Sequence, residues 1–144
     1  MISADTLFGI LSSTKPTDLE LQVPDIYTIA IVDDDEAIRE ALENLVELCG
    51  YESKLYESAE EYLADPLRSS VDCLVLDVMM PGLSGLELQE RLNGEPAKPP
   101  IIFMTSYSDE RTRMRAMAGG AVAFLTKPAD VANLIHFIEK AVKT

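Results

Sequence analysis

Histidine, cysteine and tryptophan are scarce in this sequence, which has one His, two Cys and no Trp. So few imidazole and thiol groups exclude the common zinc clusters, and Cys49 and Cys73 fit no redox or disulfide spacing. We expect both to be free thiols in apolar surroundings, as in a reducing cytoplasm. The first residues lack the basic start of a signal peptide, and no apolar run approaches the roughly 18 residues of a membrane span. A cytoplasmic location without membrane contact is therefore expected.

Basic residues are also in short supply. Twelve Lys and Arg stand against 25 Asp and Glu, which gives a net charge of −13. This field repels phosphate backbones and anionic lipid surfaces, so direct binding to nucleic acid is not expected. The rest of the composition is ordinary for one globular domain: 144 residues, of which 47% are apolar.

The chain divides into an N-terminal arm, residues 1–25, and a domain, residues 26–144. The arm is polar and carries one alternating run with Leu19, Leu21 and Val23 before Pro24. This pattern permits a disordered tail, an edge strand or an intermolecular contact.

Five short apolar runs alternate with amphipathic helical patterns in the domain. The predicted strands are 27–32, 53–56, 73–76, 101–104 and 122–125. Helices are expected to start at Asp34 or Asp35, at the capping boxes Ser58–Glu61 and Ser84–Glu87, near Ser108 or Asp109, and at Asp130. The predicted buried stripe of the last helix is Val131, Leu134, Ile135, Ile138, Ala141 and Val142. The alternation predicts an α/β fold, a doubly wound (βα)5 three-layer sandwich of the flavodoxin-like type with parallel strand order 2-1-3-4-5.

Polar residues lie at or just after the ends of four predicted strands. They are Asp33 and Asp34, Asp77, Thr105 and Lys127. In a parallel sheet all of them reach the same edge, and ligands bind there between the first and third strands. Crowded carboxylates repel one another unless a cation or protons neutralise them, and oxygen ligands without nearby His or Cys favour Mg²⁺. Such a site suits phosphoryl transfer, with Asp77 attacking phosphorus and Lys127 and Thr105 contacting phosphoryl oxygens.

Each of these residues also has an ordinary structural interpretation. Asp34 or Asp35 would cap the first helix, Thr105 would be a turn hydroxyl, and Lys127 a solvated surface lysine. Their combination at successive strand ends favours the functional interpretation.

The segments IVDDDEAIREAL, LVLDVMMPGLSGLEL, IIFMTSY and AVAFLTKP resemble the receiver domain of bacterial two-component response regulators over about residues 27 to 142. The sequences of these segments are most similar to receivers of the nitrogen-fixation type. The resemblance implies that Asp77 is the phosphoacceptor. It also implies that Asp33, Asp34, Asp77 and the backbone carbonyl of Met79 hold Mg²⁺.

The same resemblance assigns a conformational switch. Thr105 matches the switch hydroxyl, Lys127 the phosphate-binding lysine and Phe124 the switch aromatic, which on its own is simply a strand aromatic. A cis peptide bond is expected between Lys127 and Pro128. This sequence departs from the family pattern at Met79, Tyr107, Gly119-Gly120 and Ala129, which leaves phosphoryl lifetime and output surface open.

A receiver implies protein partners. The phosphoryl group would come from a histidine kinase, a phosphotransfer protein or a small phosphodonor. The phosphorylated domain would then contact a downstream protein or itself through its fourth helix, fifth strand and fifth helix. The basic patch of Arg111, Arg113 and Arg115 on the fourth helix is either a solvated face or a docking site for an acidic partner.

Two alternatives remain at this point. A receiver-like module that acts without phosphorylation, or a phosphate sink, would have the same sequence. The Asp33-x-Asp35 pattern also resembles the nucleophile motif of haloacid-dehalogenase-type phosphatases, with Asp33 attacking and Asp35 as general acid. Under the receiver interpretation the chain is no conventional enzyme but catalyses its own phosphotransfer and slow dephosphorylation.

Overall fold

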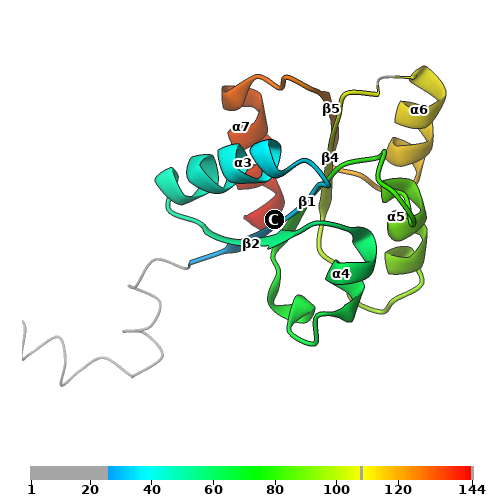
Figure 1. The fold of residues 1–144 in the computed structure, drawn as a ribbon, viewed down its shortest axis with the longest axis horizontal. Coiled ribbons are helices and arrows are strands. Elements are labelled where there is room, and N and C mark those ends of the chain that lie inside the picture. Colours follow the sequence, from blue (N-terminus) through cyan, green and yellow to red (C-terminus); the bar gives the residue numbers. More distant parts are fainter. Residues whose placement is uncertain (1–25, 108, 144) are drawn as a thin grey trace, which may run out of the picture.

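The fold is one parallel β-sheet between two layers of helices (Figure 1). The computed structural model describes residues 26–107 and 109–143. Within them the strands are β1 (Thr28–Val32), β2 (Glu52–Tyr56), β3 (Cys73–Leu76), β4 (Ile101–Thr105) and β5 (Ala123–Thr126). Their order in the sheet is β2-β1-β3-β4-β5, so the predicted fold class and strand order are confirmed. The predictions for the arm, residues 1–25, lie outside the described residues.

The helices cover both faces of the sheet. They are α3 (Glu36–Leu48), α4 (Ala59–Ala64), α5 (Gly85–Asn93), α6 (Glu110–Ala118) and α7 (Val131–Val142), with a short 3₁₀ helix η1 (Arg68–Ser70). Apolar residues of α3 and α7 pack against one face, and those of α4, α5 and α6 against the other (Figure 1). Burial of the central strands β1, β3 and β4 on both faces explains why their apolar runs show no alternation of apolar and polar residues.

Side-chain caps start each of the five helices where the sequence predicted. Asp35 accepts hydrogen bonds from Ala37 and Ile38, and Asp109 and Asp130 cap α6 and α7 in the same way. Ser84 and Glu87 form a complete capping box. At Ser58 only half of the predicted box forms, because the Glu61 carboxylate accepts from the backbone N–H of Glu57 at 3.1 Å instead of from Ser58.

Two burial predictions were wrong. Val131, in the first turn of α7, is 56% exposed, and burial on this stripe begins one turn later at Leu134. Cys49 is exposed at the C-terminal cap of α3, whereas Cys73 is buried in β3. Burial raises the pKa of the Cys73 thiol to about 12. No helix in the described ranges has the length and apolar character that crossing a bilayer requires.

Candidate functional site

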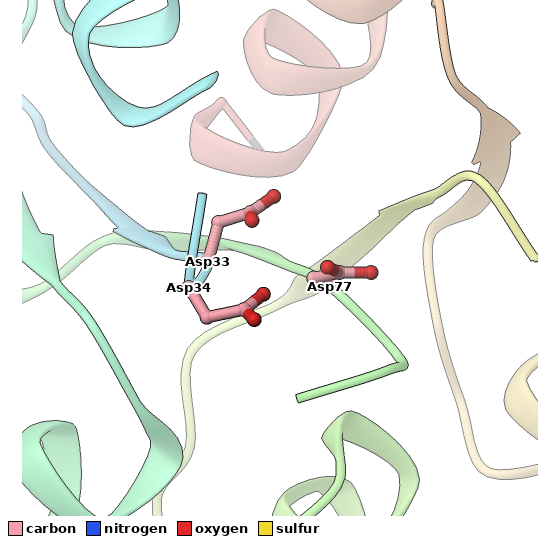
Figure 2. A group of neighbouring side chains, drawn as sticks. All are labelled: Asp33, Asp34 and Asp77. Atoms are coloured by element: carbon pink, nitrogen blue, oxygen red, sulfur yellow. The ribbon is translucent and has the colours of Figure 1, made fainter. Parts of the chain in front are cut away.

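The acidic cluster forms where β1 and β3 end side by side. Val32 is paired with Leu76, and the Asp77 N–H donates to the Val32 carbonyl at 3.0 Å. This register brings Asp33, Asp34 and Asp77 together, with ligand oxygens that all lie within 4.8 Å of one another (Figure 2). Asp33 and Asp77 are buried and Asp34 is exposed. The structure therefore brings together the three aspartates that the sequence singled out.

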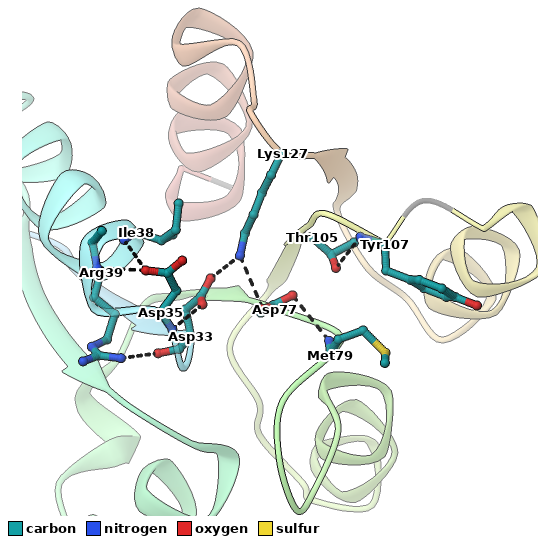
Figure 3. Close-up of polar contacts among 10 residues, drawn as sticks. Asp33, Asp35, Ile38, Arg39, Asp77, Met79, Thr105, Tyr107 and Lys127 are labelled. Atoms are coloured by element: carbon teal, nitrogen blue, oxygen red, sulfur yellow. Dashed lines mark hydrogen bonds and ion pairs between the residues drawn. The ribbon is translucent and has the colours of Figure 1, made fainter.

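Asp33 is the most constrained of the three. Its Oδ1 accepts from the Asp35 N–H at 2.9 Å, and its Oδ2 contacts the Lys127 ammonium at 2.6 Å (Figure 3). Burial raises the pKa of Asp33 more than the hydrogen bond from Lys127 lowers it, and the nearby charge of Asp77 adds to the rise. Because burial disfavours the charged form of Asp33, a cation beside the carboxylate would favour its ionised form.

Lys127 links two of the carboxylates. It follows β5 directly, and its Nζ lies 2.6 Å from Asp33 Oδ2 and 3.3 Å from Asp77 Oδ2 (Figure 3). Burial acts to lower the pKa of Lys127, but the hydrogen bond to Asp33 and the negative charges of both aspartates together raise it. The side chain is therefore an ammonium at neutral pH. The peptide bond to Pro128 is cis, as predicted.

Thr105 is the last residue of β4 and is fully buried. Its Oγ1 accepts from the Tyr107 N–H at 3.1 Å, and its backbone carbonyl accepts from the Lys127 N–H at 2.8 Å. Figure 3 shows the hydroxyl on the same side of the sheet edge as Asp77, with no bond drawn between them. Thr105 and Lys127 are thus adjacent through the backbone.

Phe124 lies one strand away from Thr105 on β5. It is partly buried, packs against the core beneath α4, α5 and α6, and has its ring centroid 6.1 Å from that of Phe103. Met79 follows Asp77 in the β3–α5 loop. The Met79 N–H donates to Asp77 Oδ1 at 3.4 Å, and its side chain is exposed.

Sequence reasoning missed Arg39, a buried arginine behind the cluster. Its Nη1 donates to the backbone carbonyl of Asp33 at 2.7 Å (Figure 3). A signal was available, because Arg39 shares the buried stripe of α3 with Leu42 and Val46 at helical spacing. A charged residue on such a stripe needs a polar partner, which here is the loop of the acidic pair.

A hollow of about 760 Å³ lies elsewhere, beside the residues that precede β3 and β4. Its lining includes Tyr62, Arg68, Asp72 and Pro100, so it belongs to the amino edge of the sheet. The acidic cluster is at the opposite edge, where open α/β sheets bind ligands.

Comparison with known proteins matches this chain to a family. A family model described as the response regulator receiver domain matches residues 29–139. The response regulator protein TodT of Pseudomonas putida strain F1 is 41% identical over 115 residues, which are 80% of this chain and 51% of TodT. The transcriptional regulatory protein FixJ of Bradyrhizobium diazoefficiens is 37% identical over 115 residues, 80% of this chain and 56% of FixJ. The chain thus spans about half the length of these curated relatives.

Solved structures agree with the sequence matches. The response regulator StyR superposes with a TM-score of 0.76 at 39% identity, over 83% of this chain and 60% of StyR. A putative response regulator from Chloroflexus aurantiacus gives a TM-score of 0.77 at 30% identity, over 83% of this chain and all (100%) of that chain. The chemotaxis protein CheY4 of Vibrio cholerae, at 24% identity, a TM-score of 0.72 and coverage of 81% and 99%, shares the fold.

Proposed function

This chain belongs to the response regulator receiver family of two-component signalling, and we propose that it accepts a phosphoryl group on the carboxylate of Asp77. The observation that carries this proposal is the cluster itself: three carboxylates within 4.8 Å, with the Lys127 ammonium on two of them. In this proposal residues 26–144 form one receiver domain that works in the cytoplasm.

The transfer would be an in-line displacement at phosphorus. A carboxylate oxygen of Asp77 forms the new O–P bond, while the bond from phosphorus to the donor breaks. The donor atom, a histidine nitrogen of a kinase or phosphotransfer protein or an oxygen of a small acyl phosphate, leaves with the bonding electron pair and takes up a proton as needed. Lys127 Nζ is 0.7 Å farther from Asp77 than from Asp33 (3.3 against 2.6 Å), so Asp77 is the less engaged carboxylate.

The donor set fits Mg²⁺. Asp33, Asp34 and Asp77 offer hard oxygen ligands in one small volume, and the backbone carbonyl of Met79 would complete the protein's share. Bound Mg²⁺ would supply positive charge that reduces repulsion between the Asp77 carboxylate and the incoming phosphoryl oxygens. The buried position of Asp33 suits this role, because its negative charge needs a partner there.

Lys127 and Thr105 would stabilise the phosphorylated state. The ammonium already contacts the Asp77 carboxylate and would pair with a phosphoryl oxygen once the group is attached. The Thr105 hydroxyl, which now accepts from Tyr107, would turn and donate to another phosphoryl oxygen.

A shift of Thr105 would bias the face formed by α6, β5 and α7. Phe124 lies on β5 between this face and the core, with Phe103 as its neighbour. Movement of Thr105 would leave space that the Phe124 ring can fill. Phosphorylation of Asp77 would therefore shift the equilibrium between two conformations of this face. We propose that this face then contacts a downstream protein or a second copy of the chain.

The phosphatase alternative conflicts with the role of Asp35. Its Oδ1 accepts from the Ala37 N–H at 2.9 Å and caps α3, which accounts for an aspartate at this position without a catalytic role. The other alternative, a module that acts without phosphorylation, is distinguished by comparing partner binding of the wild type and Asp77→Asn.

Incubation with acetyl phosphate and Mg²⁺ separates these functions. We expect an acyl phosphate that Asp77→Asn abolishes and that changes partner binding or oligomeric state. Continuous turnover of phosphodonor, lost in Asp33→Asn but kept in Asp77→Asn, would instead identify a phosphatase. Equal binding of every partner by wild type and Asp77→Asn, with and without phosphodonor, would contradict the switch.

A further inference from the structure

The loop between β3 and α5 carries Met79, and both of its ends are hydrogen-bonded to the first turn of α5. At its start, the Gly85 N–H donates to the Val78 carbonyl at 2.9 Å. At its end, Ser84 forms the capping box with Glu87. The segment between them, residues 79–83, has to be held by something else.

Glu60, the second residue of α4, contacts this segment from a separate element. Its Oε1 accepts from the Leu83 N–H at 2.7 Å. The same carboxylate lies against Gly82, where a Cβ would come within 2.9 Å of it. Gly82 also has φ of 77°, a left-handed conformation that favours glycine. Loop and carboxylate are therefore in close contact at two adjacent residues.

The capping hydrogen bonds of α4 are made by neighbours of Glu60 and not by Glu60 itself. Ser58 caps α4 by accepting from Glu61, and the Glu61 side chain accepts from Glu57. Among the hydrogen bonds of the described chain, the one from Leu83 to Glu60 is the bond that joins residues 79–83 to another element. The Met80 side chain, which is buried in the core, anchors the loop without orienting its peptide groups.

We infer that Glu60 is a positioning residue for the acceptor loop: its bond to the Leu83 N–H fixes the backbone of residues 79–83, which includes the Met79 carbonyl proposed above as a Mg²⁺ ligand. A charge-assisted bond from a carboxylate to a backbone N–H is among the stronger ways to orient a peptide group. This inference rests on the proposed function, because it gives the Met79 carbonyl a place in the cation site.

Three variants test the inference. Glu60→Ala removes the acceptor, Glu60→Gln keeps an acceptor oxygen without the charge, and Glu61→Ala is a matched control at the next, equally exposed position of the same helix. The first readout is amide hydrogen exchange of residues 79–83. The second is Mg²⁺ affinity by calorimetry.

In Glu60→Ala we expect the Leu83 amide to exchange about tenfold faster, as for the loss of one hydrogen bond to a charged group. Mg²⁺ affinity should fall by about tenfold, the lower end of the effect of residues that orient metal ligands. Glu60→Gln should recover part of both losses, because a neutral acceptor keeps the hydrogen bond but makes it weaker, and Glu61→Ala should match the wild type.

Wild-type Mg²⁺ affinity in Glu60→Ala would overturn the inference. So would equal losses in Glu60→Gln and Glu60→Ala, which would assign the effect to charge, or an equal loss in Glu61→Ala, which would assign it to the helix as a whole. The proposed function fails on a different result, namely labelling by acetyl phosphate that persists in Asp77→Asn, which these exchange data do not depend on.

Discussion

Lys127 contacts both Asp33 and Asp77, so under the proposed function it would assist phosphoryl transfer and, before transfer, compete with a cation for the same oxygens. Lys127→Met removes the ammonium from Asp33 and Asp77 and keeps the side-chain length. We expect labelling of Asp77 to slow by about 100-fold, the usual effect of removing one donor aimed at developing charge. Mg²⁺ affinity should rise, because two carboxylates lose their internal partner. Rapid-quench labelling and calorimetry measure the two quantities, and weaker Mg²⁺ binding with an unchanged rate would contradict this account.

Arg39 supports the backbone of the acidic pair. Arg39→Ala leaves the buried Asp33 carbonyl without its 2.7 Å donor, and we expect the free energy of unfolding to fall by about 2 kcal/mol, typical for a hydrogen bond from a charged group. Urea denaturation measures it. Glu57→Ala is the control: Glu57 is 74% exposed and 3.6 Å from the Arg39 guanidinium, so its removal should cost less than about 0.5 kcal/mol. Equal effects would assign the role of Arg39 to the ion pair instead.

Residues at strand ends were predictable, and those that support them mostly were not. Asp33 and Asp77 come directly after apolar runs and Lys127 two residues after one, and a parallel sheet brings such positions to one edge. Glu60 gives no comparable signal: it is one acidic residue among several in a first turn, and its partner Leu83 is 23 positions away. Contacts of that kind depend on the exact separation of two elements, which periodicity does not specify.

At the scale of elements, α5 and α6 meet through a buried glutamine. Gln89 is buried, and its Nε2 donates to the Ala116 carbonyl at 2.8 Å. A Cβ on Gly119 would lie 2.6 Å from the Gln89 side-chain oxygen. The Gly-Gly end of α6, one of the departures from the family pattern, therefore makes room for this side chain.

Gly119→Ala tests that explanation. Its φ of −77° suits alanine, so only the clash should matter, and we expect a loss of about 1–3 kcal/mol in the free energy of unfolding. In a Gln89→Ala background the same change should be close to neutral, because the obstructing side chain is gone. Urea denaturation of the four proteins in this cycle gives the coupling energy. An identical cost of Gly119→Ala in both backgrounds would show that the clash is unimportant.

The C-terminal end of α4 is held by a pH-dependent hydrogen bond. The Tyr56 hydroxyl donates to Asp65 at 2.6 Å, which lowers the pKa of Asp65, while burial and this bond raise the pKa of Tyr56. A lowered carboxyl pKa contributes stability above the unfolded value of 3.8, and this contribution is lost as pH falls through the folded value. We expect Tyr56→Phe to destabilise the protein clearly at pH 6 and progressively less below about pH 4. Denaturation at several pH values checks this, and a difference independent of pH would contradict it.

The positions of elements could be read from the sequence more reliably than their burial. Caps and glycines marked the helix ends because those signals are local, and Asp35, Ser84 and Asp130 act as predicted. Val131 was misjudged because the helical stripe of α7 is not buried along its whole length: Val131 in the first turn is exposed, whereas Leu134 and Ile138 are buried. Periodicity alone does not specify whether the end turns of a helix are covered.

On the scale of the whole molecule, the charge of −13 contains one concentrated site and many dispersed carboxylates. The arginine patch of α6 is partly satisfied internally, since Arg113 pairs with Glu110 at 2.5 Å and Arg115 pairs with Glu90. A docking role for these arginines would first require those ion pairs to open. The acidic cluster differs from the dispersed charges because Asp33 and Asp77 are buried. Burial of a carboxylate costs free energy unless a positive charge is beside it, and here one ammonium, Lys127, serves two carboxylates.

Uptake of a phosphoryl group by Asp77 is the most direct test of the central claim. Wild type and Asp77→Asn are treated with acetyl phosphate, with Mg²⁺ or with EDTA, and the products are examined by intact mass and peptide mapping. We predict one added phosphoryl group, on Asp77, in the wild type with Mg²⁺, and none in EDTA or in the variant. An unmodified wild type, or the same modification in Asp77→Asn, would contradict the account.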